Sequence, residues 1–307
     1  MFASAKSWLE GAVTTAPPLV VVPRAKRGAA IELDDVGLRV AAPEGEVEIL
    51  RGASLRIEAG EFVCLLGPSG SGKSTILNLV AGLARPTSGR VLEGEAPVAG
   101  PGPDRAVVFQ DAALFPWLNL RKNVEFPLGL QGIKAQERAR RSEELLRLVH
   151  LWRFQDRYPH ELSGGMRQRG AIARALAGDP AVLLMDEPFA ALDAQTREIL
   201  QGEVERIWSA TRKTVIFVTH NVREAVRLAD RVVLMGTRPG RILHEETIDL
   251  PRPRSASDPR VAALAGGVAK RIASEVEKVA REEADDAWVA PGARRDGDPR
   301  RHLGRGI

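Results

Sequence analysis

The chain has little cysteine, no long hydrophobic run and little net charge, and each of these shortages narrows what the protein can be. The only cysteine, Cys64, excludes a disulfide framework or a cysteine zinc site within one chain. We expect Cys64 to be a small buried hydrophobe, and such cysteine usage fits a reducing compartment. No apolar run approaches the roughly 18–20 residues of a membrane-spanning helix. If the protein works at a membrane, it is therefore expected to act through a partner.

The net charge of +4 comes from 44 basic and 40 acidic side chains. This balance does not indicate a nucleic-acid partner, because such proteins usually carry a concentrated basic face. The strongest basic concentration lies between Arg294 and Arg305, where a solvated tail is expected. A secretory signal is not expected, since Glu10 precedes the mildly apolar residues 11–22 and the pair Pro17-Pro18 interrupts them.

A length of 307 residues allows one large domain or two modest ones. Residues 1–29 lack periodicity and are predicted to be a flexible arm, followed by a main domain at 30–254. Residues 255–290 predict an amphipathic helix, which begins at Asp258-Pro259 and repeats apolar residues every three or four positions. Because Gly266 and Gly267 each weaken this helix by roughly 1 kcal/mol, we expect it to dock on the core or on a partner. Residues 291–307 are predicted to be a disordered basic tail.

Short apolar runs alternate with helical patterns along the main domain. Strands are predicted at residues 31–33, 47–50, 55–57, 62–66, 106–109, 181–185, 214–218 and 231–235. Helices are predicted at residues 74–83, 136–149, 165–177, 195–209 and 222–228. This alternation predicts an α/β fold with a mainly parallel sheet and a ligand at the carboxyl ends of its strands. A mostly helical insert is expected at about residues 111–165.

The strongest motif lies between a predicted strand and a predicted helix. It consists of Gly67, Pro68, Ser69, Gly70, Ser71, Gly72, Lys73, Ser74 and Thr75. The glycines let successive backbone N–H groups surround phosphate oxygens, and the helix N-terminus adds positive charge. Lys73 places a cation on the β- and γ-phosphates, and Ser74 offers a hydroxyl to Mg²⁺. A chance Gly/Ser turn is the alternative, but the flanking strand and helix favour nucleoside triphosphate binding.

Two carboxylates, Asp186 and Glu187, follow an apolar strand. Asp186 suits Mg²⁺, which prefers oxygen ligands and retains several waters. Glu187 can accept a proton from an attacking water. Taken alone, a solvated acidic turn would explain the pair equally well; the phosphate-binding motif favours the catalytic interpretation.

A second glycine-rich helix start lies at Ser163, Gly164 and Gly165. An ordinary helix cap is the simple interpretation, but such a helix start is also an anion site. Since one ATP needs only one cradle, this second cradle suggests contact with the ATP of another copy. Gln110 and His220 each follow a predicted strand, and parallel strands would bring both to the same edge, although either alone would more often be structural.

Together these motifs resemble the ATPase subunit of ABC transporters over roughly residues 31–254. The family's order is kept: phosphate loop, glutamine loop at Gln110, signature at 162–168, acidic strand end at 182–187, the loop of Asp193 and the switch His220. The resemblance implies a P-loop NTPase fold with a mainly parallel core, an N-terminal antiparallel β subdomain and a helical subdomain insert.

The resemblance also implies a head-to-tail homodimer that holds two ATP molecules, each between the phosphate loop of one copy and Ser163–Gly165 of the other. Glu187 would be the general base, His220 would hold the γ-phosphate and Asp193 would link the two sites. Gln110 would sense Mg²⁺ and couple the site to the insert. The insert would meet integral membrane permease subunits at the cytoplasmic face of the membrane. Residues 115–117 could contact that partner or form a small core within the insert.

A finer resemblance is to importer ATPases for nitrate, alkanesulfonates and taurine, based on residues 109–117, 158–163, 218–222, 238–242 and 249–254. It implies that ATP hydrolysis powers uptake of a small solute, which an extracytoplasmic binding protein would deliver indirectly. One departure is that residues 36–46 lack the family's usual aromatic residue that stacks on adenine. Val40 or a neighbour occupies that position, which leaves open how the base is held.

A soluble ABC-type ATPase acting on nucleic acid or ribosomes is the alternative function. Such proteins generally fuse two ATPase units or carry zinc modules or long coiled coils, whereas this chain has one set of motifs and one cysteine. An exporter ATPase is disfavoured by residues 158–163 and 238–242 and by the lack of a fused membrane domain. No nucleic-acid partner is therefore expected.

Overall fold

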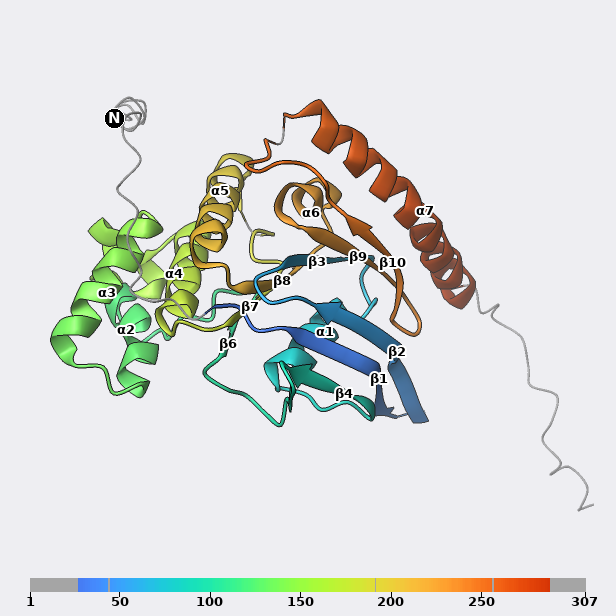
Figure 1. The fold of residues 1–307 in the computed structure, drawn as a ribbon, viewed down its shortest axis with the longest axis horizontal. Helices are drawn as coiled ribbons and strands as arrows, with labels where there is room; N and C mark the ends of the chain where they lie inside the picture. Colours follow the sequence, from blue (N-terminus) through green and yellow to red (C-terminus); the bar gives the residue numbers. More distant parts are fainter. Residues whose placement is uncertain (1–26, 44, 191, 256, 288–307) are drawn as a thin grey trace, which may run out of the picture.

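The computed structural model describes residues 27–43, 45–190, 192–255 and 257–287 (Figure 1). Most of the predicted N-terminal arm and all of the predicted basic tail lie outside these residues. Within the described part, no helix combines the length and the apolar character needed to cross a bilayer.

The main sheet is six-stranded, in the order β10-β9-β3-β8-β7-β6. Its strands are β3 (Phe62–Leu66), β6 (Arg105–Val108), β7 (Val182–Asp186), β8 (Thr214–Thr219), β9 (Arg231–Gly236) and β10 (Arg241–Thr247). Every pairing is parallel except that of β10 with β9. The predicted α/β fold with a mainly parallel sheet is confirmed, and the carboxyl ends of β3, β7 and β8 meet at one edge.

A second, antiparallel sheet has the order β2-β1-β4-β5. It contains β1 (Ile31–Ala42), β2 (Gly45–Ile57), β4 (Ser88–Glu93) and β5 (Ala96–Pro97). The sequence pattern predicted two short strands where β2 is one long strand, because the exposed Arg51 and Gly52 interrupt its apolar residues. The buried side of this sheet packs with α1 (Lys73–Ala81) and the main sheet in a shared hydrophobic cluster.

Three helices of the main domain begin directly after a residue whose side chain caps the helix N-terminus. Ser163 accepts a hydrogen bond from the Met166 N–H and starts α4 (Gly164–Ala177). Asp193 does the same for the Thr196 N–H and starts α5 (Ala194–Thr211). Asn221 caps α6 (Val222–Leu228). These short polar caps place the starts of the helices beside the predicted functional loops.

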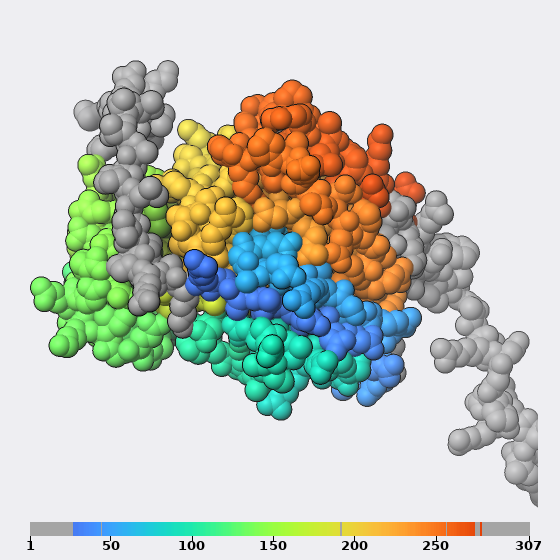
Figure 2. Space-filling view, in the orientation of Figure 1, coloured from blue at the N-terminus to red at the C-terminus, as the bar shows by residue number. Residues whose placement is uncertain are grey.

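The insert contains α2 (Leu120–Leu130), α3 (Ala135–Leu148) and two short 3₁₀ helices, Trp152–Phe154 and Pro159–Glu161. It lies at one end of the molecule, coloured green in Figures 1 and 2. Leu120, Val124 and Leu146 form its core together with Ala171 and Ala173 of α4. Helix α4 therefore belongs to the insert and to the main domain at once.

The C-terminal helix α7 (Pro259–Ala287) lies across α6, at the opposite end from the insert (Figure 1). Val261, Ala265 and Val268 are buried in the same hydrophobic cluster as the main sheet. The segment that leads into α7 is held by Arg254, whose buried guanidinium donates to carbonyls of the linker and of α6. The first turns of α7 are thus part of the main core.

Candidate functional site

The phosphate-binding segment connects β3 to α1 and is shaped by its glycines. Gly70 and Gly72 have φ angles of 77° and 82°, in the left-handed region that favours glycine. At Gly67, an added Cβ would lie 2.5 Å from the Met235 carbonyl oxygen, so no side chain fits there. The segment therefore has the tight curvature that exposes backbone N–H groups to an anion.

Lys73 is buried within this segment. Its Nζ donates hydrogen bonds to the carbonyl oxygens of Gly67 and Pro68, both at 2.8 Å. Burial lowers the pKa of Lys73, while Glu187 and Asp186 oppose that shift. A cation and a helix N-terminus thus converge on the loop, which suits a multiply charged phosphate.

Ser74 and Asp186 meet at the start of α1. Ser74 Oγ donates to Asp186 Oδ1 at 3.0 Å. Burial raises the pKa of Asp186, and the nearby Glu187 carboxylate adds to that shift. Hydroxyl and carboxylate oxygens are ligands that Mg²⁺ accepts, so the pair fits this ion. Across the described residues, no group of three or more His, Cys, Asp or Glu side chains forms a metal site, so water and phosphate would have to complete the coordination.

Glu187 and His220 lie at the ends of neighbouring strands and touch. His220 Nδ1 is 3.0 Å from Glu187 Oε2. Glu187 has a φ of 43°, an uncommon value for a residue with a side chain, and its N–H donates to the Val218 carbonyl. The two side chains line a cavity of about 50 Å³ together with Arg197 and Glu224. This arrangement holds a carboxylate where it can accept a proton, with an imidazole beside it.

Ser163–Gly165 and Asp193 lie beside each other in the same chain. A Cβ added to Gly165 would lie 3.2 Å from Leu192 and 3.4 Å from Thr196, at the start of α5. The side chain of Asp193 accepts from the Thr196 backbone N–H, which lowers the pKa of Asp193. Both predicted interface motifs are therefore exposed helix starts on one surface.

Gln110 is exposed and follows the end of β6. The preceding residue, Phe109, is held by α4, because the buried Gln168 donates from Nε2 to the Phe109 carbonyl at 3.0 Å. The signature helix thus fixes the backbone at which the Gln110 segment begins.

The aromatic residues after Gln110 form a partly exposed cluster on the insert. Phe115 packs against Phe126, with ring centroids 4.7 Å apart, and against Trp117 at 5.5 Å. The Arg174 guanidinium lies 5.2 Å from the Phe115 ring centroid. Phe115 therefore packs within the insert, while Trp117 is 70% exposed on its surface.

The segment expected to hold the base carries two valines. Val40 of β1 pairs with Val47 of β2, and the two are 41% and 47% exposed. Neither strand contains an aromatic residue. Two exposed valines, rather than an aromatic ring, occupy this position.

Sequence reasoning missed three buried polar residues beside His220: Thr219, Gln201 and Glu224. They come from β8, α5 and α6 and are joined by hydrogen bonds. The only sequence signal was a glutamate four positions after the histidine, which is common on any helix.

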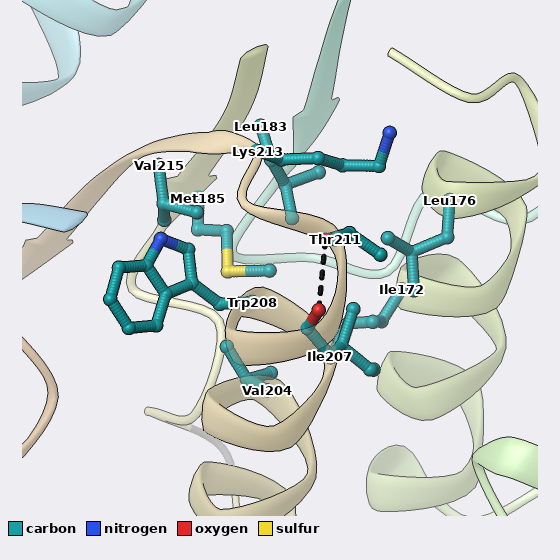
Figure 3. A pocket seen from close by; sticks show the side chains of 10 residues that line it. All are labelled: Ile172, Leu176, Leu183, Met185, Val204, Ile207, Trp208, Thr211, Lys213 and Val215. Atoms are coloured by element: carbon teal, nitrogen blue, oxygen red, sulfur yellow. Dashed lines mark hydrogen bonds between the residues drawn. The ribbon is translucent and has the colours of Figure 1, made fainter. Parts of the chain in front are cut away.

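A separate apolar cavity lies between α4, α5 and the sheet (Figure 3). Its volume is about 10 Å³, and the side chains facing it are mostly aliphatic, such as Ile172, Leu183 and Val204. This is at most the space of one water, and apolar cavities stay dry. The cavity is a packing gap in the core, whereas the predicted site residues lie at the edge of the sheet.

The family model for ABC transporters matches residues 50–190. An ABC transporter ATP-binding protein of Methanocaldococcus jannaschii, itself uncharacterised, is 54% identical over 208 residues, which are 68% of this chain and 78% of the relative. A nitrate import ATP-binding protein of Synechocystis is 49% identical over 221 residues, covering 72% of this chain and 83% of the relative. A taurine import ATP-binding protein of Burkholderia pseudomallei is 46% identical over 252 residues, covering 80% and 97%.

Among solved structures, a dimeric ATP-binding cassette in a post-hydrolysis state, bound to ADP and Pi, is similar to this chain. It is 35% identical with a TM-score of 0.66, and the match covers 72% of this chain and 100% of that one.

Proposed function

This chain belongs to the family of ABC transporter ATP-binding proteins, and from that premise we propose which residues carry out its reaction, how its copies assemble and which solute class it serves. The chain is an importer ATPase: it binds ATP and hydrolyses it. The single observation that carries the importer assignment is the match to a taurine import relative over 97% of that relative's length.

The phosphates of ATP would be bound by residues 67–75. Their backbone N–H groups and the Lys73 ammonium would neutralise the charge on the β- and γ-phosphates. Ser74 and Asp186 would hold Mg²⁺, which supplies further positive charge to the phosphates when it is bound. Gln110, at the adjoining strand end, would complete this side of the site.

Glu187 would act as the general base on the attacking water. The 3.0 Å approach of His220 Nδ1 to Glu187 Oε2 supports this role, because the imidazole can orient the carboxylate and then contact the γ-phosphate.

The complete site would require two copies of the chain. The exposed helix start at Ser163–Gly165 lies beside the loop of Asp193, and the N-terminus of a helix favours a bound anion. In a head-to-tail pair, this surface would cover the ATP held by the phosphate loop of the other copy. The dimeric state of the similar ATP-binding cassette supports this arrangement.

The membrane partners would be permease subunits that bind the helical insert. The partly exposed aromatic cluster of Phe115, Trp117 and Phe126 supports this surface, because aromatic side chains are enriched at the centres of protein interfaces. The chain would then sit at the cytoplasmic face of the membrane as a peripheral subunit, and an extracytoplasmic binding protein would select the solute.

The solute would be a small compound such as nitrate, taurine or an alkanesulfonate, as the names of the relatives indicate. Growth of a deletion strain on single nitrogen or sulfur sources tests this. Loss of growth on one of these compounds, restored by the wild-type gene but not by a Glu187→Gln variant, would support the proposal. Unchanged growth on all of them would reject this solute class, and co-purification with nucleic acid or ribosomes would favour the alternative function.

A further inference from the structure

The exposed catalytic candidate His220 is flanked by polar groups that are almost fully buried. The His220 side chain is 68% exposed and has little packing to hold it. By contrast, Thr219, Glu224 and Gln201 are 2%, 7% and 6% exposed. Burying a polar group costs free energy unless the group is hydrogen-bonded. The hydrogen bonds of these three side chains therefore show what their burial achieves.

The Glu224 carboxylate is the centre of these contacts. Thr219 Oγ1 donates to one of its oxygens, and Gln201 Nε2 donates to the other at 2.7 Å. Both bonds are donated to the carboxylate, so the ionised form satisfies them best. Burial raises the pKa of Glu224, and the two donated bonds act against that shift.

The same contacts hold the backbone on both sides of His220. Thr219 Oγ1, while donating to Glu224, accepts from the Asn221 N–H at 3.0 Å. Asn221 in turn accepts from the Glu224 N–H at the start of α6. The residues before and after His220 are therefore tied to one buried carboxylate, while the imidazole itself projects into solvent.

The network also reaches the helix that begins at Asp193. Gln201 lies on α5, and its Oε1 accepts from Arg227 of α6 at 2.8 Å. One turn earlier on α5, Arg197 donates to the carbonyl of Leu192, directly before Asp193. The loops of Asp193 and His220 are thus held by side chains of a single helix.

We propose that Glu224 is a positioning residue for ATP hydrolysis, which acts through the Thr219 hydroxyl to hold the backbone that aims His220 at the Glu187 carboxylate. This rests on the proposed catalytic role of His220. It predicts that breaking the Thr219–Glu224 bond impairs the chemical step and leaves ATP binding intact.

The test compares the substitution of a buried threonine by valine at the two ends of β8, at Thr219 and at Thr214. Thr219→Val removes the hydroxyl that links Glu224 to the His220 segment, and Thr219→Ser keeps it. Thr214→Val is the control: its hydroxyl is equally buried and bonded, to the Ala29 carbonyl and the Gly60 N–H, but at the far end of the strand. Turnover and KM for ATP are measured for each variant, along with thermal stability.

We expect Thr219→Val to lower kcat by about ten- to a hundredfold, the effect of misplacing a catalytic group. The KM for ATP should change by less than about twofold, because the contacts that bind ATP in the ground state are unchanged. Thr219→Ser should retain nearly full turnover. Thr214→Val should lose stability without this fall in kcat.

A double substitution separates positioning from general destabilisation. In a His220→Ala background, Thr219→Val should cause no further loss of turnover, since the group it positions is gone. Equal kcat values for Thr219→Val and Thr214→Val would overturn the proposal, as would a further loss in the His220→Ala background. A wild-type chain without ATP turnover would instead reject the proposed function, and the positioning role with it.

Discussion

His220 Nδ1 lies 3.0 Å from Glu187 Oε2, and these residues directly follow the neighbouring parallel strands β8 and β7, respectively. The contact joins residues 33 positions apart in the sequence. It depends on the parallel sheet, which delivers both strand ends to one edge. The topology of the fold therefore places the proposed base beside the residue proposed to orient it.

Glu187→Gln should bind ATP but stall its hydrolysis. The amide keeps the shape of the side chain and loses the ability to accept a proton, so turnover should fall by about 10²–10⁴-fold. Phosphate release measures the loss, and light scattering should detect a stable dimer at saturating ATP and Mg²⁺. A variant that stays monomeric, alone and with its permease subunits, would contradict the shared site.

Lys73→Ala should abolish hydrolysis by weakening the hold on the phosphates. Loss of a charged hydrogen-bond donor costs about 1.5–3 kcal/mol, so ATP binding should weaken by about ten- to a hundredfold. The variant also frees the carbonyls of Gly67 and Pro68 that Lys73 now bonds. Equilibrium nucleotide binding measures the effect, with the exposed Lys270→Ala as a control that should bind like the wild type. Unchanged binding by the Lys73 variant would count against residues 67–75 as the phosphate site.

Asp186 should make stability depend on pH in a definite direction. Because burial raises the pKa of Asp186 above its ordinary value of 3.8, the folded chain retains a proton that the unfolded chain has lost. The stabilising contribution is complete below the ordinary value and is lost as the pH rises through the raised value. The unfolding free energy of the wild type, relative to Asp186→Asn, should therefore fall with rising pH.

Asp193→Asn should change the pH dependence of the unfolding free energy in the opposite direction. The Thr196 backbone N–H lowers the pKa of Asp193, so its stabilising contribution is present above the ordinary value and lost as the pH falls. Denaturant titrations without Mg²⁺ over a pH series should show differences of opposite slope for the two variants. Parallel slopes would show that one of the two assigned shifts is wrong.

Arg254→Met should destabilise the whole domain. The Arg254 side chain is 4% exposed and donates to the carbonyls of Val226, Ile248 and Leu250, each at 3.0 Å. Burial, together with the neighbouring Arg252, lowers the pKa of Arg254 to about 10. Methionine fills similar space but leaves these carbonyls unpaired, which should cost about 2–4 kcal/mol in the free energy of unfolding.

The control for this measurement is Arg260→Met. Arg260 pairs with Asp258 on the surface and is 63% exposed, so its loss should cost less than about 1 kcal/mol in a urea titration. Equal losses for the two variants would mean that the buried contacts of Arg254 do not hold the C-terminal segment in place.

Local patterns predicted the elements that carry the phosphate site. The strand Phe62–Leu66 is fully apolar and ends at glycine, so its bounds were predicted to the residue. The bounds of helix α6 were likewise predicted to the residue, and the structure shows that Asn221 caps it. Helix α2 was not predicted as a separate element, because Pro127 lies inside it and breaks the helical pattern.

The side-chain contacts of the site were beyond reach of the sequence pattern. The Gln201–Glu224 bond spans 23 positions and depends on how α5 packs against α6. Strand β4 was missed because its first residues, Ser88 to Arg90, are exposed and not apolar. The sequence therefore predicted candidate site residues from their chemical groups, whereas the buried residues that contact them became apparent only from the tertiary packing.

Helix α4 has a consequence for how the protein can be divided. Its Ile172 lies in the core of the main sheet, while Ala171 and Ala173 lie in the core of the insert. At Gly170, an added Cβ would lie 2.6 Å from Leu120 of α2, so the two helices are in close contact. Excising or exchanging the insert together with α4 would remove packed side chains from the core of the main sheet as well as from the core of the insert. The insert is therefore not a transferable module, and chimeras between relatives should be joined within loops that leave α4 whole.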